Sequence, residues 1–206
     1  MTIREDYDRV AEAYSAALRD ELEGKPLDRW LLERVAIETK GAVLEIGCGP
    51  GQVAGFLATR GATVHGLDLS AAMIAEAQHH YPKVSFQTGD FHRLPFADAS
   101  LGAVVAMYAL VHLEVSELAP VLAEVARVLR PGGLFLAATH AGEERLQPGA
   151  LFGVPVELTW IFHPPAAFFD AVQAAGLMPL ERIVREPYLG AEHGSRRAYV
   201  LAKKPG

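Results

Sequence analysis

The chain has 206 residues, half of them hydrophobic, with 25 acidic against 19 basic residues and a formal net charge of −6. This length is sufficient for one sizeable core and short for two complete domains, so we expect a single domain over residues 1–206. The acidic balance and the lack of a Lys/Arg cluster argue against a nucleic-acid partner, because phosphate binding needs clustered positive charge.

The cysteine count and the hydropathy indicate the cellular compartment to expect for this protein. Cys48 is the only cysteine, so neither an internal disulfide nor a cysteine metal framework is expected, which is typical of a reducing compartment. Residues 1–6 carry charges and lack the apolar core of a signal peptide, and no stretch approaches the ~18 apolar residues of a membrane span. We therefore expect a cytoplasmic protein without a membrane span or a bound metal.

Hydrophobic periodicity predicts the elements in chain order. Two helices, over 5–19 and 26–39, precede an alternation of apolar strands and helices. The predicted strands are 42–46, 62–67, 83–88, 101–107 and 134–138, and the helices between them are 52–59, 70–80 and 115–129. Residues 140–163 lack a period and are rich in Gly and Pro, so we expect a long loop, followed by a helix over 164–175 and strands over 179–187 and 196–203. This alternation is typical of a parallel sheet with helices on both faces.

The most informative stretch is 43–51, an apolar run that contains Glu45 and then breaks into Gly47, Gly49 and Gly51 at every second position. The pattern predicts a buried strand, a tight turn and then a helix. Glycine suits such a turn because it adopts positive φ and lets the backbone approach a ligand closely. A small molecule is therefore expected on this turn.

The glycine turn is compatible with two kinds of nucleotide-binding site. A dinucleotide fingerprint needs a third glycine at position 52, where Gln52 stands, so an NAD(P)-dependent oxidoreductase is the less favoured alternative. Asp68 ends the second predicted strand, 21 residues after Gly47, where a carboxylate can accept two hydrogen bonds from a ribose diol. Ser70 is the better candidate for capping the following helix.

With these residues in place, the chain resembles the class I S-adenosylmethionine (SAM)-dependent methyltransferases, specifically the small single-domain kind called type 11. The resemblance rests on motifs that agree in order and spacing across 43–136: the glycine turn, Asp68, Gly89-Asp90-Phe91, Leu94-Pro95-Phe96 and Leu129-Arg130-Pro131-Gly132-Gly133. It implies an α/β, Rossmann-like sheet of seven strands with the last antiparallel. It also implies SAM as methyl donor, S-adenosylhomocysteine as product and a small-molecule acceptor.

The resemblance implies a different role for each of three segments of the chain. Residues 1–40 would form a helical lid, 41–140 the SAM-binding core, and 140–206 the substrate loop with the C-terminal helix and hairpin. Asp90 and the next backbone N–H would read the adenine edge, and a lid helix carrying Tyr7 and Tyr14 would cover the cofactor. Two positions depart from the family pattern, Phe91 in place of a small residue and Leu101-Gly102 in place of an acid. The implied cofactor-binding residues are Tyr14, Glu45, Gly47, Cys48, Gly49, Gly51, Asp68, Leu69, Met73, Gly89, Asp90, Phe91, Met107 and Tyr108.

Methyl transfer needs an aligned nucleophile and, for a hydroxyl or protonated amine, a base. His112 is the first candidate base, because it follows the strand nearest the expected methyl group, although packing explains such a histidine as well. His140 and His163 are further candidates for base or substrate contact. Aromatic residues in the long loop, Phe152, Trp160 and Phe162, would line the acceptor pocket or serve as plain core. A SAM-binding protein without methyl transfer remains an alternative, and either a monomer or a homodimer is compatible with the sequence.

Overall fold

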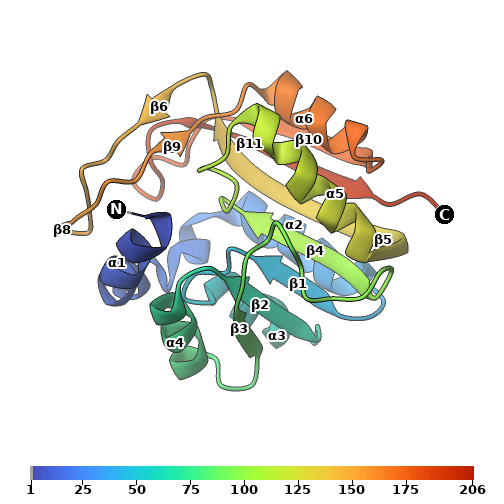
Figure 1. The fold of residues 1–206 in the computed structure, drawn as a ribbon, viewed down its shortest axis with the longest axis horizontal. Helices are drawn as coiled ribbons and strands as arrows, with labels where there is room; N and C mark the ends of the chain where they lie inside the picture. The colour runs from blue at the N-terminus through green and yellow to red at the C-terminus, as the bar shows by residue number, and fades with distance from the viewer. Residues whose placement is uncertain (1) are drawn as a thin grey trace.

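The computed structural model describes residues 2–206, and within them the main sheet has seven strands in the order β10-β11-β5-β4-β1-β2-β3 (Figure 1). Neighbouring strands among β1 to β5 pair in parallel, whereas β11 runs antiparallel to both β5 and β10. The expected Rossmann-like sheet with an antiparallel last strand is therefore confirmed. Its strands are β1 (Val43–Ile46), β2 (Val64–Asp68), β3 (Ser85–Thr88), β4 (Leu101–Met107), β5 (Leu129–Ala141), β10 (Met178–Arg185) and β11 (Arg196–Lys203).

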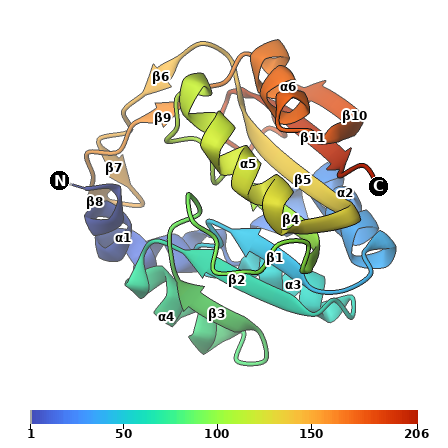
Figure 2. The same cartoon turned by 45° about the vertical axis from the view of Figure 1, so that its right-hand side comes forward.

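Helices cover both faces of the sheet and give a three-layer arrangement (Figures 1 and 2). Alternate strand residues point to opposite faces, so Leu44 joins one core cluster and Val43 the other. The first cluster packs α5 (Leu118–Val128) and α6 (Pro165–Ala174) onto the sheet. The second packs α2 (Pro26–Glu38), α3 (Gln52–Thr59) and α4 (Ala71–His80) onto the opposite face. Short 3₁₀ turns, η1 (Glu21–Gly24) and η2 (Val115–Glu117), precede α2 and α5.

The first helix, α1 (Ile3–Leu18), begins with a capping box in which Thr2 and Glu5 bond to one another's backbone N–H. Ser70 caps α4 by accepting the Met73 N–H, as the sequence predicts. Asp8 on α1 joins the two helices, because its carboxylate accepts hydrogen bonds from the Ser70 hydroxyl at 2.6 Å and the Ala72 N–H at 3.2 Å. The N-terminus of α4 is thus where α1 is anchored.

The long loop expected over 140–163 is partly ordered into short strands, which is a correction to the sequence prediction. β6 (Arg145–Leu146) pairs with β9 (Trp160–Ile161), and β7 (Ala150–Leu151) pairs with β8 (Val154–Pro155). Pairs of two residues leave no period that a sequence window could detect. The tip of this segment packs on α1 and α4 in a small separate cluster of Val10, Ala11, Met73, Leu151, Val156 and Leu158.

The lid is also composed differently from the expectation that both N-terminal helices form it. Leu31, Leu32 and Val35 of α2 are fully buried in the core beneath the sheet, so α2 belongs to the scaffold. The β7–β8 hairpin instead packs with α1 in one apolar cluster. Among residues 2–206 no helix is long and apolar enough to cross a membrane.

Candidate active site

The glycine turn after β1 adopts the backbone that its sequence predicts. Gly47, Gly49 and Gly51 have φ of +62°, +49° and +84°, in the left-handed region that favours glycine. A Cβ at Gly47 would lie 2.5 Å from the Cβ of Ala109, so packing excludes one there. At Gly49 the nearest side-chain atom is 4.0 Å away, on Tyr14, and the space above the turn is open. Gly49 is therefore the point at which a ligand can rest on bare backbone.

Asp68 ties this turn to the end of β2. One carboxylate oxygen accepts the Gly49 N–H at 2.8 Å and the other accepts the Ser70 N–H at 2.9 Å. Burial raises the pKa of Asp68, and the backbone donors oppose that rise. Asp68 lines a cavity of about 190 Å³ together with other residues expected at the cofactor: Tyr14, Gly47, Gly49, Leu69, Met73, Gly89, Asp90, Phe91, Met107 and Tyr108.

Asp90 lies at the rim of this smaller cavity and is largely exposed. It accepts hydrogen bonds from the backbone N–H of His92 at 2.8 Å and pairs with its ring Nδ1 at 2.7 Å, so the carboxylate also caps a turn. Phe91 packs partly against the core beneath α5 and stands next to the His92 ring. The bulk of Phe91, unexpected for this position, is therefore accommodated by packing.

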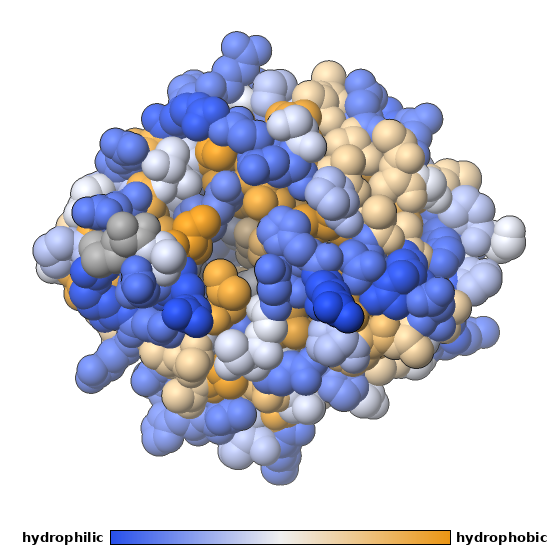
Figure 3. Space-filling view, viewed as in Figure 1, coloured by the Kyte–Doolittle hydropathy of each residue, from blue (hydrophilic) through white to orange (hydrophobic). Residues whose placement is uncertain are grey.

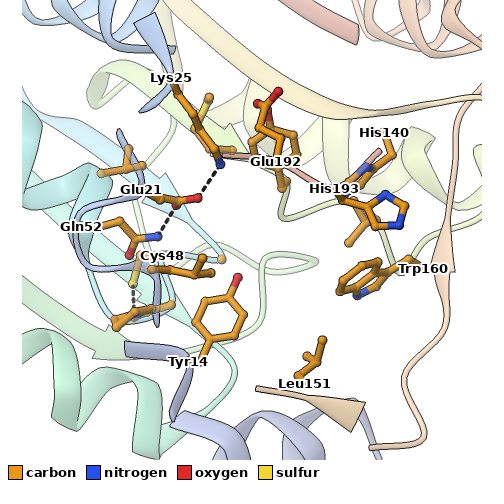
Figure 4. A pocket seen from close by; sticks show the side chains of 18 of the residues that line it. Tyr14, Glu21, Lys25, Cys48, Gln52, His140, Leu151, Trp160, Glu192 and His193 are labelled. Atoms are coloured by element: carbon orange, nitrogen blue, oxygen red, sulfur yellow. Dashed lines mark hydrogen bonds and ion pairs between the residues drawn. The ribbon is translucent and has the colours of Figure 1, made fainter. Parts of the chain in front are cut away.

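A second cavity, of about 460 Å³, opens on the other side of the two lid tyrosines. On the side of the molecule that carries α5, the surface is hollowed beside the N-terminal end of the chain, with hydrophobic side chains at the rim of the hollow (Figure 3). Lys25, Glu21 and Gln52 lie along one side, and His140, His193 and Trp160 along the other (Figure 4). Leu151 and Phe152 of the β7–β8 hairpin complete an apolar wall. Phe162 does not line the cavity; it is buried beside His140, with the centroids of the two stacked rings 4.9 Å apart.

The two cavities have a common boundary. Tyr7, Tyr14, Gly49, Met107 and Tyr108 border both of them. The tyrosine rings of the lid meet edge to face at 6.1 Å, which holds them as one unit over the glycine turn. A molecule lying across Gly49 would therefore have one end in each cavity.

Tyr108 is held rigidly at this boundary. Its φ of +57° is uncommon for a bulky residue, and such a conformation persists only where the surroundings enforce it. The Tyr108 hydroxyl lies 3.1 Å from that of Tyr199 and 3.3 Å from Asp28, to which Tyr199 donates at 2.7 Å. Arg185 hydrogen-bonds Tyr199 and holds Glu192 through two bonds of 2.7 Å. Burial raises the pKa of Tyr108, so its hydroxyl stays protonated.

Glu21 and Lys25, which lie beside the glycine turn, were not among the residues predicted from the sequence. Glu21 of η1 accepts hydrogen bonds from Lys25 and from the Gln52 amide, the latter at 2.7 Å. Gln52 Oε1 and one carboxylate oxygen of Glu45 are buried without a hydrogen-bond partner among the described residues. Two unpartnered acceptors and a lysine, all bordering the larger cavity, suit the ammonium and carboxylate groups of an amino acid. Burial raises the pKa of Glu45.

His112 follows β4, as expected, but both of its ring nitrogens are in use. Nδ1 lies 2.9 Å from the Thr159 carbonyl, which can only accept, so Nδ1 carries the proton. Nε2 therefore accepts from the Tyr7 hydroxyl at 2.8 Å. Burial lowers the pKa of His112. The expected role of His112 as a base that touches the acceptor does not fit this arrangement; His112 instead fixes the lid residue Tyr7.

The other two candidate histidines differ in position. His163 has no exposed surface, bonds to the Thr139 hydroxyl and the Leu113 carbonyl, and stacks on Phe168; it lines neither of the two cavities, so the geometry lends no support to the predicted substrate contact. His140, at the end of β5, borders the larger cavity. Burial, followed by the positive charge of Arg197, lowers the pKa of His140 to about 3, so its ring is neutral near pH 7.

Residues 43–133 match a family of proteins described as methyltransferase domain. The chain is 33% identical over 138 residues to an uncharacterized methyltransferase of Synechocystis sp.. The matched segment covers 67% of this chain and 58% of the relative. It is 34% identical over 152 residues to the demethylmenaquinone methyltransferase of Beutenbergia cavernae, covering 71% of this chain and 61% of the relative. The chain thus spans less than two thirds of the length of these curated relatives.

Among solved structures, the chain is similar to one in the complex between the Haloferax volcanii Trm112 methyltransferase activator and a methyltransferase. The two superpose with a TM-score of 0.77 at 22% identity, over 100% of this chain and 98% of that one. At this identity the likeness concerns the fold. The strand order, the glycine turn, the position of Asp68 and the matched relatives agree: the chain carries a methyltransferase domain over residues 43–133, and its sheet has the fold of the class I SAM-dependent methyltransferases.

Proposed function

We propose that this protein transfers a methyl group from SAM to a small-molecule acceptor by in-line displacement. The observation that carries the proposal is the pair of cavities that meet at Gly49, Tyr14 and Tyr108. The smaller cavity has the carboxylates and apolar walls that suit an adenosine. The larger has room for the amino-acid end of the cofactor and for an acceptor beside it, within the size range of small-molecule sites.

The chain's own residues fit the cofactor in three places. Asp68 presents carboxylate oxygens where the ribose hydroxyls would donate, and Asp90 with the Phe91 backbone faces the adenine edge. The glycine turn with Cys48 carries the link to the amino acid. Glu45, Glu21 and Gln52 offer acceptors for its ammonium group, and Lys25 offers a cation for its carboxylate. SAM supplies an activated methyl group, so the protein is left with binding, orientation and the exclusion of water.

The lid would orient the acceptor and exclude water from the two cavities. Tyr7 and Tyr14 separate the cavities from solvent on the α1 side, and Leu151 and Phe152 do so on the hairpin side. Asp8 holds α1 against α4 through the Ser70 hydroxyl. An acceptor confined between this cover and Tyr108 would approach the methyl group from the side of the larger cavity. The apolar wall with Trp160 suits a partly apolar acceptor body.

Two further points belong to the proposal. The size and concave lining of the larger cavity support a free small molecule as acceptor, rather than nucleic acid, and suit a monomer or a homodimer equally. The single buried Cys48, which forms no disulfide, supports a cytoplasmic location.

The proposal is tested in two steps. Calorimetry should show binding of S-adenosylhomocysteine and none of NADH. Incubation with SAM and a panel of hydroxylated, aminated and apolar acceptors, with S-adenosylhomocysteine formation as the readout, should then show turnover with at least one class. Tight binding without turnover on any acceptor would instead indicate a SAM-binding protein without methyl transfer.

A further inference from the structure

A chain of three side chains leads from the larger cavity to the protein surface. His140 borders the cavity and places its Nδ1 2.6 Å from the Ser195 hydroxyl. The same hydroxyl lies 3.1 Å from Nδ1 of His193, which is exposed to solvent. The Nε2 of His140 has no hydrogen-bond partner among residues 2–206.

A hydrogen bond from Arg197 determines how Ser195 can bond to the two histidines. Its guanidinium donates to the Ser195 oxygen at 2.7 Å and cannot accept, so it occupies one lone pair of that oxygen. One proton and one lone pair then remain on Ser195 for two imidazole nitrogens. One histidine must therefore donate to Ser195 while the other accepts from it. One arrangement converts into the other when Nε2 of one histidine gains a proton, two protons shift along the chain, and Nε2 of the other histidine loses a proton.

In one of these arrangements His140 is ready to act as a base. Its Nδ1–H donates to Ser195, whose hydroxyl donates to His193, and the Nε2 lone pair of His140 is left free. Burial and the positive charge of Arg197 lower the pKa of His140, which disfavours a second proton on this ring. A proton that reaches Nε2 must therefore be passed onward as it arrives.

His112, the first candidate base, has no such path for a proton to the surface. Tyr7 could give a proton only to Nε2 of His112, and Nδ1–H of His112 ends on the backbone carbonyl of Thr159. An amide carbonyl does not carry a proton onward. Of these two histidines, His140 alone is linked through a hydroxyl to an exposed imidazole.

We propose that the acceptor is a protic nucleophile, with an O–H or N–H group, whose proton leaves through His140, Ser195 and His193. This inference rests on the proposed methyl transfer. The acceptor oxygen or nitrogen forms the bond to the methyl carbon, and the electrons of the broken carbon–sulfur bond stay on sulfur. The acceptor proton bonds to Nε2 of His140, the Nδ1 proton moves to Ser195, and the Ser195 proton moves to Nδ1 of His193. His193 then releases its Nε2 proton to water.

Proton exchange tests the chain without any acceptor. In the S-adenosylhomocysteine complex, NMR saturation transfer from water measures how fast the ring N–H of His140 that faces Ser195 exchanges. His193→Gln keeps a hydrogen-bond acceptor for Ser195 but cannot carry a proton. We expect this variant to slow the exchange at least tenfold, whereas His79→Gln, at another exposed histidine, leaves it unchanged. Unchanged or faster exchange in His193→Gln would overturn the relay, because loosening of a merely structural contact speeds exchange.

Kinetics test the acceptor class separately. Ser195→Ala should lower kcat at least tenfold for phenol or amine acceptors and leave methylation of a pyridine nitrogen, which has no proton to lose, within twofold. Equal losses on both kinds, or turnover of aprotic acceptors alone, would contradict a protic acceptor. A lack of turnover on every acceptor with normal cofactor binding would contradict the proposed function, while the exchange experiment still decides the relay.

Discussion

The carboxylate of Asp68 lies 2.8 Å from the backbone nitrogen of Gly49, so the end of β2 and the glycine turn after β1 form one rigid unit. Each carboxylate oxygen holds one backbone N–H and retains a further lone pair toward the smaller cavity. The same side chain therefore shapes the cofactor site and is positioned to bind within it.

Asp68→Asn should weaken S-adenosylhomocysteine binding by roughly 10- to 100-fold, the range expected for loss of hydrogen bonds to a charged group. One amide position can no longer accept, so either a backbone N–H or a ribose hydroxyl loses its partner. Calorimetry measures the effect. Asp170→Asn on the exposed face of α6 is the control, and equal affinity in both variants would show that Asp68 does not bind the ribose.

Substitutions at two glycines of the turn should affect cofactor binding and protein stability to different extents. Gly49→Ala adds a Cβ in open space at φ +49°, so we expect the free energy of unfolding to fall by only about 1–2 kcal/mol while S-adenosylhomocysteine binding weakens at least about tenfold. Gly51→Ala places its Cβ 2.8 Å from the Phe86 ring and 3.0 Å from Ala77 Cβ, so stability should fall further. Denaturant melts and calorimetry on both variants measure this. The prediction fails if Gly49→Ala binds normally.

Lys25 should act on the amino-acid end of the cofactor alone. Lys25→Met should weaken S-adenosylhomocysteine binding by roughly tenfold, because a charge-assisted contact to the carboxylate is lost. Binding of 5′-methylthioadenosine, which lacks the amino-acid carboxylate and ammonium groups, should change by less than about twofold on the same reasoning. Lys83→Met, at an exposed lysine, is the matched control. A parallel loss for both ligands would place the effect of Lys25 in the fold instead.

Buried neutral histidines should make the protein sensitive to acid. His112, His140 and His163 all have a pKa below the ordinary value, mainly through burial. The unfolded chain gains protons below about pH 6.5 and the folded chain does not, so stability falls as the pH drops from 6.5 toward the folded values.

For His140, whose pKa is lowered to about 3, the loss at pH 5 amounts to about 2 kcal/mol. His140→Asn should therefore lose about 2 kcal/mol less than the wild type between pH 7 and pH 5 in urea denaturation. Identical pH profiles for the wild type and His140→Asn would show that His140 is not held neutral by the fold.

The framework of the site could be predicted from the sequence because backbone geometry dictates it. The spacing of Gly47, Gly49 and Gly51 follows from three positive φ values, and Asp68 follows from the rule that strand ends meet at one edge of a parallel sheet. The sheet, its antiparallel last strand and the cap at Ser70 were all predicted and are confirmed.

The rest depends on contacts between distant segments, which periodicity does not report. Glu21, Lys25 and Gln52 come together only because η1 lies beside the glycine turn. His112 follows the expected strand, yet Thr159 and Tyr7, far away in sequence, occupy its ring. Ser195 and His193 carry no sequence pattern that links them to His140, and only the pairing of β11 with β5 brings them to it.

The small cluster shared by α1 and the β7–β8 hairpin couples the two halves of the site. Val10 and Leu151 lie in one apolar contact set, and the rings of Tyr14 and Phe152 meet at 5.5 Å, so the helix over the cofactor and the hairpin over the acceptor cavity share one core. Lifting either segment alone would expose the other's apolar face to water. Under the proposed function, the cofactor and the acceptor would therefore be exchanged together, in one opening of this shared cover.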